Sequence, residues 1–489
     1  MTERLVFGYG TERHVGQTPD PPSLRPGEQG PAPTPETPRP AGKRERRDWA
    51  FTGLLAFTAA LYFRPQDQIP GFAWVPFAEI SAIIGLAAMA YGRVTRGLSL
   101  TRLTPELIGI AALGFVILLT APFSIWPGGA VGTFTNVFVK VLLIYMLMVN
   151  TLTSPDRLHR FMRLVMLVTG YIATRAMFDY LRGINLIENG RVQGAIGGMF
   201  QNPNDLALNM VAVLPLSVLV AIRSKTTAGK LGAAFLGCMM IGAVTATHSR
   251  GGFVGLAVMV LILGVQLARR QPAAAGAGAL VILLALPFTP SSYWERVSSI
   301  TDSSLDASGS REARRILLRE AWRTFLHFPL YGVGAAQFPN YNPPGRVETW
   351  RETHNVVLQV ASELGVFGLL AFGFLLVRAF AAGRITRRLL RRASGAAPPR
   401  WPGAANIRAG QPAVISPDER QYLDAHAGAM MAAVIGWFVC ALFASVAYSW
   451  TFYYLLALAA APHTILADRL AQHAPARRTT ATRLAEVRV

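Results

Sequence analysis

The sequence THNVVLQVASELGVFGLLAFGFLLVRAF occupies residues 353–380 and decides the class of the fold. It begins with polar residues and continues as an apolar run, residues 355–382, that is long enough to cross a bilayer as one helix. Histidine is the one side chain whose unperturbed pKa lies near neutrality. His354, at the mouth of the predicted span, is therefore a candidate general base. The alternative is an ordinary cap at the membrane interface.

Comparable apolar runs recur along the whole chain. Its 489 residues are 52% hydrophobic and 15% charged, which excludes an ordinary soluble enzyme. We therefore expect an all-α polytopic membrane protein with about twelve transmembrane helices. The predicted spans are residues 49–63, 72–91, 105–123, 131–150, 160–179, 204–222, 230–247, 251–268, 273–288, 355–382, 426–448 and 450–467.

The charges between the spans predict the orientation. Every connection that follows an even-numbered span is rich in arginine or lysine, whereas the short odd-numbered connections hold only Arg64, Arg182, Arg191 and Arg250. Basic residues concentrate on the cytoplasmic side of membrane proteins. We therefore predict a multi-pass protein with both termini cytoplasmic. This asymmetry also explains the formal net charge of +20 without a nucleic-acid partner.

The segments outside the spans differ in character. Residues 1–48 are rich in proline and end in a basic cluster, which predicts a disordered cytoplasmic N-terminus ahead of a membrane domain at 49–467. Residues 289–354 form a long extracytoplasmic loop between the ninth and tenth helices, with an amphipathic helix expected from Ser310 onward. Residues 383–425 are predicted to be a cytoplasmic insert, and 468–489 a basic cytoplasmic tail.

Two arginines flanked by glycine lie on the predicted outer face. Arg191 follows Gly190, and Arg250 precedes Gly251-Gly252 in the turn between the seventh and eighth spans. Glycine lets a ligand approach the backbone closely, and a guanidinium matches the oxygens of a phosphate. The alternatives are a structural turn at Arg191 and an arginine that reaches to the interface at Arg250.

Four further polar residues could support such a site. Asn202 and Asn204 belong to a predicted turn that caps the sixth span. Asn355 follows the histidine, and Glu363 lies about two helical turns below it, where it could also satisfy a neighbouring helix. We find no acidic metal motif on the outer side, no phosphate-binding P-loop and no dinucleotide fingerprint. The sequence therefore predicts no metal and no cofactor.

Taken in order, these motifs resemble those of the O-antigen ligase and polymerase superfamily of bacterial surface-glycan assembly. The matching elements are Gly190-Arg191, Phe200-Gln201-Asn202-Pro203-Asn204, Ser249-Arg250-Gly251-Gly252, Pro329-Leu330-Tyr331-Gly332-Val333-Gly334, His354-Asn355 and Glu363-Leu364-Gly365. The resemblance implies a C-type glycosyltransferase fold in the bacterial inner membrane. It also implies an inverting, metal-independent transfer from an undecaprenyl-pyrophosphate-linked glycan to a hydroxyl of a glycan or lipid-core acceptor.

The resemblance also assigns roles to residues. His354 corresponds to the essential histidine, and Arg191 and Arg250 correspond to the arginines that hold the pyrophosphate. Two alternatives stay open. The motifs do not separate a ligase from a polymerase, although we lean slightly to a polymerase. A lipid-linked oligosaccharide flippase or other transporter would need charges along a central cavity, whereas the predicted membrane charges are Lys140, Arg175, Asp179 and Glu363, mostly in the outer half.

Overall fold

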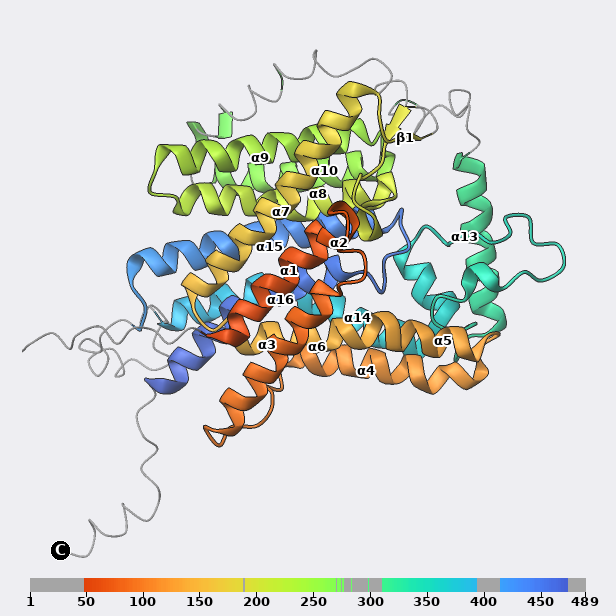
Figure 1. Ribbon diagram of the computed structural model, residues 1–489, viewed down its shortest axis with the longest axis horizontal. Helices are drawn as coiled ribbons and strands as arrows, with labels where there is room; N and C mark the ends of the chain where they lie inside the picture. Colours follow the sequence, from red (N-terminus) through yellow and green to blue (C-terminus); the bar gives the residue numbers. More distant parts are fainter. Residues whose placement is uncertain are drawn as a thin grey trace, which may run out of the picture. The chain divides into compact units, whose positions relative to one another are not determined.

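The computed structural model is predominantly helical in the residues that it describes (Figure 1). These are residues 48–187, 190–269, 310–393 and 414–473, with isolated positions at 271–273, 275, 276, 283 and 298. The predicted ninth span at 273–288, the first part of the long loop and both chain ends fall outside these ranges almost entirely.

The helices and strands follow one another in a simple order. The longer helices are α1 (Trp49–Phe63), α3 (Phe77–Val94), α4 (Pro105–Thr120), α6 (Val139–Thr151), α7 (Pro155–Arg182), α8 (Pro203–Arg223), α9 (Thr227–Ala246), α10 (Arg250–Ala268), α13 (Ser310–His327), α14 (Val356–Ala393), α15 (Pro417–Ala441) and α16 (Trp450–Gln472). The short elements are α2 (Pro65–Gln68), η1 (Ala121–Phe123), α5 (Pro127–Thr133), the π-helical η2 (Phe134–Phe138), η4 (Gly198–Phe200) and η7 (Phe338–Asn340). Strands β1 (Leu186–Ile187) and β2 (Arg191–Val192) pair antiparallel.

Several long helices begin with the same local signature. A polar residue accepts a hydrogen bond from the first turn, and a proline follows it at the first helical position. Thr104 caps α4 in this way, Ser154 caps α7, and Ser416 caps α15. The side-chain oxygen satisfies an N–H that has no partner inside the helix, and proline loses nothing there because its missing N–H is one of these groups.

The predicted class of fold is confirmed. Ten helical segments among the described residues are long and apolar enough to cross a membrane, and they coincide with ten of the predicted spans. Helix α1 has only 15 residues and is shorter than these ten. The total of about twelve spans and the C-type glycosyltransferase fold stay predictions.

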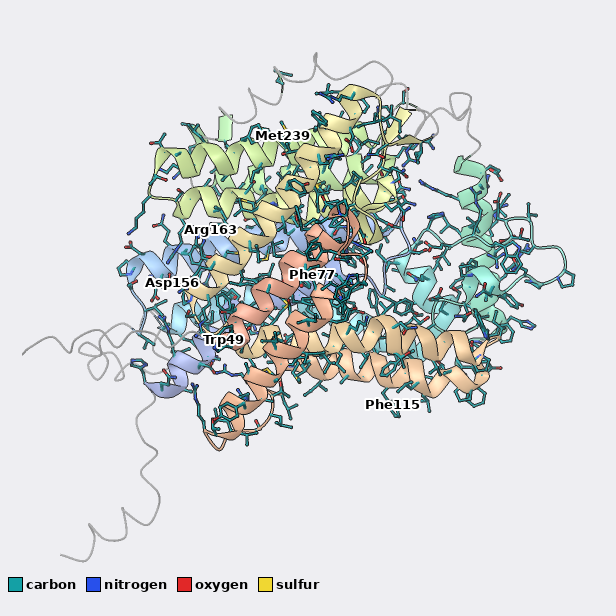
Figure 2. All side chains as sticks on the ribbon, viewed as in Figure 1. Trp49, Phe77, Phe115, Asp156, Arg163 and Met239 are labelled. Atoms are coloured by element: carbon teal, nitrogen blue, oxygen red, sulfur yellow. The ribbon has the colours of Figure 1, made fainter. Side chains whose placement is uncertain are left out.

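Large apolar side chains point outward from several of these helices. Ile83 on α3, Phe115 on α4, Leu231 on α9 and Leu370 on α14 each keep between 64% and 67% of their surface exposed. Figure 2 shows Phe115 directed away from the neighbouring helices. Apolar side chains on the outside of a bundle suit a lipid surround and not water.

Ion pairs gather the basic connections at one end of the bundle. They join the start of α1, the connection before α4, the start of α7 and the ends of α8, α14 and α16. The pairs are Arg157–Asp48, Arg102–Asp468, Arg223–Asp156, Arg387–Asp424 and Arg469–Glu419. We call this the basic end; in Figure 1 it lies at the left, and α13 lies at the right. The connections predicted from their charge to share one side of the membrane thus lie together at one end of the bundle. The side of the membrane that the basic end faces stays a prediction.

Two reporter fusions test that orientation. A reporter fused near Gly309, in the long loop, should report the extracytoplasmic side, and one near Gly403, in the insert, should report the cytoplasm. The reason is that arginine-rich short connections stay on the cytoplasmic side. Alkaline phosphatase activity and fluorescence of a green fluorescent protein give complementary readouts of the two sides. The same sign at both positions would contradict the topology.

The helices near the C-terminus differ from the predicted spans in three places. Helix α14 continues past residue 382 to Ala393, so it is longer than the predicted span, and the start of the insert stays a prediction. Helix α15 begins at Pro417 and ends at Ala441, so residues 442–448 are not part of a span. Helix α16 continues to Gln472, beyond the predicted 467. Hydropathy predicted a helix at 442–448 because that segment is apolar and largely buried, but the segment is not helical.

Three of the four charges predicted to lie in the membrane form ion pairs. Lys140 lies 3.1 Å from Glu79 of α3, and Arg175 lies 3.1 Å from Asp179, as expected for positions four residues apart. A further pair, with a buried carboxylate, was not predicted from the sequence. Arg378 of α14 donates from Nε and Nη2 to Oε1 of Glu106 on α4, at 2.8 and 2.6 Å.

Candidate active site

A glycine-rich loop docks onto a kink at the start of α14. The N–H groups of Val333 and Gly334 donate to the carbonyls of Ser362 and Glu363, at 2.9 and 2.8 Å. Gly365 interrupts the helical backbone with a φ of 63°. A Cβ on Gly332 would collide with the carbonyl group of Glu363, and one on Gly365 would collide with Leu330. The two glycine motifs, about thirty residues apart in sequence, therefore form one joint.

Glu363 lies beneath this joint and binds two loops. Its Oε2 accepts hydrogen bonds from the backbone N–H of Ala336 and from the hydroxyl of Tyr448, both at 2.9 Å. Only 2% of Glu363 is exposed. A buried carboxyl with two donors fixes the position of its neighbours. This geometry suits a supporting role, as the sequence suggested.

His354 lies immediately before α14 and is held by its backbone. Its N–H donates to the hydroxyl oxygen of Ser445 at 2.9 Å, and the same hydroxyl bonds that of Thr353 at 3.0 Å. The imidazole itself makes no hydrogen bond to any residue that the structure describes. Both ring nitrogens are thus available to a ligand.

Asn355 joins the same loop to α14. Its Oδ1 accepts from the N–H groups of Val357 and Leu358, both at 3.0 Å, which caps the helix. Its Nδ2 donates to the carbonyl of Leu442 at 3.1 Å. The non-helical segment 442–448 therefore fixes the residues on both sides of the histidine, and the polar side chains of Ser445 and Tyr448 were its only signal in the sequence.

The surroundings of His354 keep its ring neutral. Burial lowers its pKa to about 4, and the positive charges of Arg314 and Arg351 lower it further in the same direction. Above this pH the imidazole is uncharged and carries a lone pair on one nitrogen. A neutral ring can accept a proton from a hydroxyl, which is the state that general-base catalysis needs.

Arg191 lies on β2 and holds the turn that precedes α10. Its Nε donates to the carbonyl of Thr247 at 3.0 Å, and its Nη2 donates to Oδ1 of Asn204 at 2.9 Å. The hydroxyl of Ser249, the N-cap of α10, donates to the same oxygen at 2.9 Å. Arg250 is the first residue of α10. Asn204 thus joins the two arginine motifs into one cluster.

Asn202 supports this cluster from the neighbouring position. Its Oδ1 accepts the N–H of Asn204 at 2.8 Å and so caps α8. The sequence predicted this cap, and it sets the direction in which Asn204 projects.

Two carboxyl groups connect the arginine cluster to the histidine loop. Asp205 follows Asn204, and Glu352 lies two residues before His354; their carboxyl groups are close enough to interact electrostatically. Burial among the surrounding groups raises the pKa of Glu352, although its side chain keeps some surface exposed, and a hydrogen bond from Ser445 acts in the opposite direction. Arg191, Arg250 and His354 therefore all lie at the end of the bundle opposite the basic end. Glu352 and Ser445 were not predicted from the sequence.

Strained backbone is concentrated at the same end. In the described part of the chain, the non-glycine residues with positive φ are Arg64, Asn185, His248, Ala336, Trp350 and His354, with φ between 47° and 60°. None of them lies in a connection at the basic end. Such conformations cost free energy and persist only where surrounding contacts enforce them, most often at functional sites.

No group of three potential metal ligands occurs among the residues that the structure describes. The predicted independence from metal ions stays a prediction, to be tested with a chelator.

Comparison with known proteins supports the motif assignment. None of the curated proteins compared with the chain matches it. Residues 232–373 match the model of the O-antigen ligase family; this range includes Arg250, the glycine joint and His354, whereas Arg191, Asn202 and Asn204 precede it. The match confirms the resemblance to the O-antigen ligase superfamily that the ordered motifs indicated.

Proposed function

We propose that this chain is an inverting glycosyltransferase of bacterial surface-glycan assembly. Its donor is a glycan on undecaprenyl pyrophosphate, its acceptor is a hydroxyl of a glycan or lipid core, and the reaction needs no metal. The family match supports an O-antigen ligase or polymerase type of activity. A multi-pass helical bundle suits a donor that is itself embedded in the membrane.

The reaction assigns one task to each part of the site. The acceptor oxygen attacks the anomeric carbon from the face opposite the pyrophosphate, so one C–O bond forms while the bond to the phosphate oxygen breaks. A neutral His354 takes the acceptor proton. Negative charge grows on the departing pyrophosphate, and the guanidinium groups of Arg191 and Arg250 stabilise it. Inversion at the anomeric carbon follows from this single displacement.

The observation that carries the proposal is the cluster around Asn204. One amide oxygen joins Arg191 to the turn of Arg250, and Asp205 beside it interacts with the loop of His354. A guanidinium held in position at the same end of the bundle as a neutral histidine fits phosphate-linked transfer. Helix packing alone needs neither the two arginine motifs nor a histidine in a strained conformation.

Transfer in vitro tests the proposal. The purified protein in lipid nanodiscs is mixed with a synthetic undecaprenyl-pyrophosphate-linked repeat and a defined acceptor, and the products are separated by mass. We expect an elongated or transferred glycan with an inverted anomeric configuration. Chains of several repeats on the lipid carrier indicate a polymerase, and attachment to a lipid core indicates a ligase.

A chelator is the second arm of this experiment. Excess EDTA should leave the rate unchanged within error, because arginines and not a metal ion neutralise the leaving group in this mechanism. Loss of turnover on chelation, restored by Mg²⁺ or Mn²⁺, would show that the proposed mechanism is wrong.

A flippase remains the alternative from another class. One observation favours it, because Glu106 in the first turn of α4 pairs with Arg378 and lies near His463, which places buried ionisable groups away from the proposed site. Translocation of a fluorescent lipid-linked glycan in proteoliposomes, without any change in glycan mass, would support this reading.

A further inference from the structure

The loop before His354 contains a pocket that none of the candidate site residues lines. It has a volume of about 230 Å³ and lies between the last turns of α13 and the turn that follows η7. Arg323 and His327 line it from the helix; Tyr341, Pro343 and Arg346 line it from the turn. None of these residues belongs to the cluster around Asn204 or to the contacts of His354. The pocket therefore needs its own explanation.

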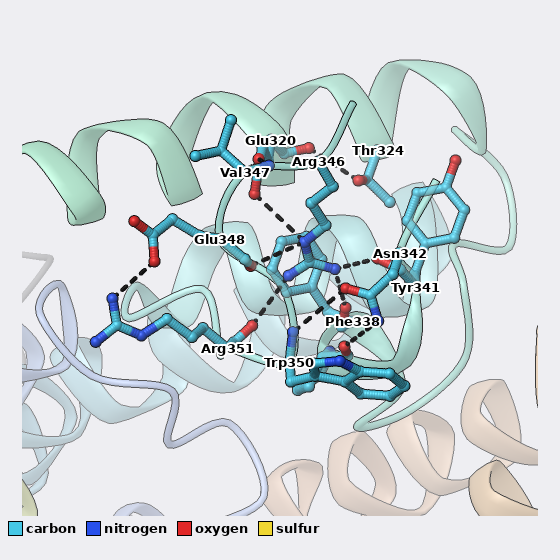
Figure 3. Close-up of polar contacts among 11 residues, drawn as sticks. Glu320, Thr324, Phe338, Tyr341, Asn342, Arg346, Val347, Glu348, Trp350 and Arg351 are labelled. Carbon is cyan, nitrogen blue, oxygen red and sulfur yellow. Dashed lines mark hydrogen bonds and ion pairs between the residues drawn. The ribbon is translucent and has the colours of Figure 1, made fainter. Parts of the chain in front are cut away.

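One buried arginine builds the wall of this pocket. Only 2% of the Arg346 side chain is exposed, and its guanidinium donates to the carbonyls of Phe338, Tyr341, Glu348 and Arg351 (Figure 3). Glu320 of α13 lies 3.3 Å from its Nε and also accepts the N–H of Val347 at 3.0 Å. These contacts fix the turn against α13, so the pocket is a preformed part of the fold and not a gap between mobile loops.

The charge of the pocket comes from its helix side. Glu320 neutralises Arg346, and backbone carbonyls occupy its donors. Arg323 and His327, by contrast, are exposed and hydrogen-bond to no described residue. They lie four residues apart on α13, so their side chains project on the same side of the helix. The ring of His327 packs edge-on against Phe328 at 4.7 Å, which limits its orientation. Two N–H donor groups without a hydrogen-bond partner among the described residues, one of them permanently cationic, thus line the pocket.

The turn side offers flat apolar surfaces. Tyr341 contributes a ring that packs edge-on against Phe328 at 5.6 Å, and Pro343 and Pro344 contribute two rigid rings. Aromatic faces pack well against the C–H groups of a flat ligand while polar groups at the edge bind its substituents. The volume lies below the roughly 300–1,000 Å³ typical of sites for drug-sized ligands, so it suits one ring and not an oligosaccharide.

We propose that this pocket binds one acidic sugar residue of the glycan that the protein transfers or extends. The carboxylate of a uronic acid would pair with Arg323, its hydroxyls would meet His327, and its ring would lie against Tyr341 and the prolines. This inference rests on the proposed function for the source of the glycan. The chemistry of recognition rests on the pocket alone.

The contacts of Arg346 and Arg351 connect the pocket to the candidate active site. Arg346 binds the carbonyl of Arg351, and the charge of Arg351 acts on the ring of His354. The turn ends only eight residues before the histidine (354 − 346). A sugar held here would lie on the same loop as the base. Such a subsite would raise the affinity for the glycan without taking part in the bond-breaking step.

The test compares two variants that remove the same charge from the same helix. Arg323→Gln alters the pocket, and Arg319→Gln is its control, because Arg319 is exposed on α13 and does not line the pocket. Binding of sodium glucuronate and of glucose to the purified full-length protein is followed by saturation-transfer NMR. We expect glucuronate to bind the wild type and the control alike. Arg323→Gln should bind it roughly tenfold or more weakly, which is the loss typical of one charge-assisted hydrogen bond.

Each other outcome overturns the assignment. Equal binding of glucose and glucuronate would show that the pocket does not recognise the acid group. Displacement of glucuronate by equimolar inorganic phosphate would show that the pocket binds anions in general and not an acidic sugar. Loss of glucuronate binding in phosphatidylglycerol nanodiscs, relative to phosphatidylcholine, would point to a lipid headgroup as the occupant. An unchanged affinity in Arg323→Gln would place the binding elsewhere.

Transfer assays separate this proposal from the proposed function. With an acidic glycan, Arg323→Gln should raise KM roughly tenfold and leave kcat near that of the control. If glucuronate binds at Arg323 but no glycan is transferred, the proposed function fails and the subsite stands. If transfer occurs with an unchanged KM in this variant, the subsite fails and the function stands.

Discussion

Replacing His354 by asparagine should reduce glycan transfer by about 10²-fold or more, the usual contribution of a general base. Asparagine is the informative replacement because His354 has a φ of 49°, a left-handed conformation that asparagine tolerates better than most residues. An amide cannot take a proton at neutral pH, so the base is removed while the backbone strain stays similar. The rate of product formation at saturating donor is the measurement.

Two comparisons keep this result interpretable. His473→Ala removes an exposed histidine at the basic end and should leave the rate unchanged. Donor affinity of His354→Asn should stay within a few-fold of the wild type, because a base acts chiefly in the transition state. If the variant retains normal kcat, His354 is not the base and another group takes the proton; Glu352 is then the first residue to examine.

The dependence of the rate on pH tests the same role of His354 as the general base. The pKa of His354 is lowered to about 4, so the ring is neutral and active above that pH and loses activity as the pH falls through it. The acidic limb of kcat/KM, which reports the free protein, should therefore lie well below the ordinary value for histidine. Bound pyrophosphate adds negative charge nearby and favours the protonated ring, so the limb of kcat should lie at higher pH.

The sequence predicted the class of fold because hydropathy and charge act over whole helices. Twenty apolar residues or a cluster of arginines leave a signal that survives errors of a few positions. The same averaging explains the error at 442–448, where buried apolar residues form a non-helical segment. Its backbone is satisfied by side chains from elsewhere, such as Gln359, whose Oε1 accepts the N–H of Ala447 at 3.0 Å. No local pattern encodes such a long-range partner.

Some residues of the candidate site were predicted from the sequence and others were not, for a similar reason. Arg191, Arg250 and His354 were identified because glycine and polar neighbours mark them in the sequence. Ser445 and Glu352 were missed because a single serine or glutamate in a loop has many ordinary explanations. The pocket beside Arg346 was missed for a third reason. It depends on α13 and a turn about twenty residues later folding against each other, and only the tertiary structure brings them together.

Arg191→Lys should weaken donor binding by about tenfold or more, even though the positive charge is kept. A guanidinium donates from a planar fork to two acceptors at once, and an ammonium cannot reproduce that geometry. In the structure, Arg191 already uses this fork to join Thr247 to Asn204. The variant therefore removes both a phosphate donor and the contact that places the turn of Arg250. Binding of undecaprenyl pyrophosphate to protein in nanodiscs measures the loss.

A comparison of two lipids separates these roles. If Arg191 binds the pyrophosphate, its replacement should lower the affinity for undecaprenyl pyrophosphate more than the affinity for undecaprenyl monophosphate, because the second phosphate loses its partner. If Arg191 only positions the turn, the affinities for both lipids should fall equally. Arg182→Gln is the matched control, since Arg182 ends α7 at the same end of the bundle and stacks on Phe178 at 4.2 Å. That variant should bind both lipids as the wild type does; a similar loss there would mean that overall charge at this end, and not Arg191 in particular, holds the donor.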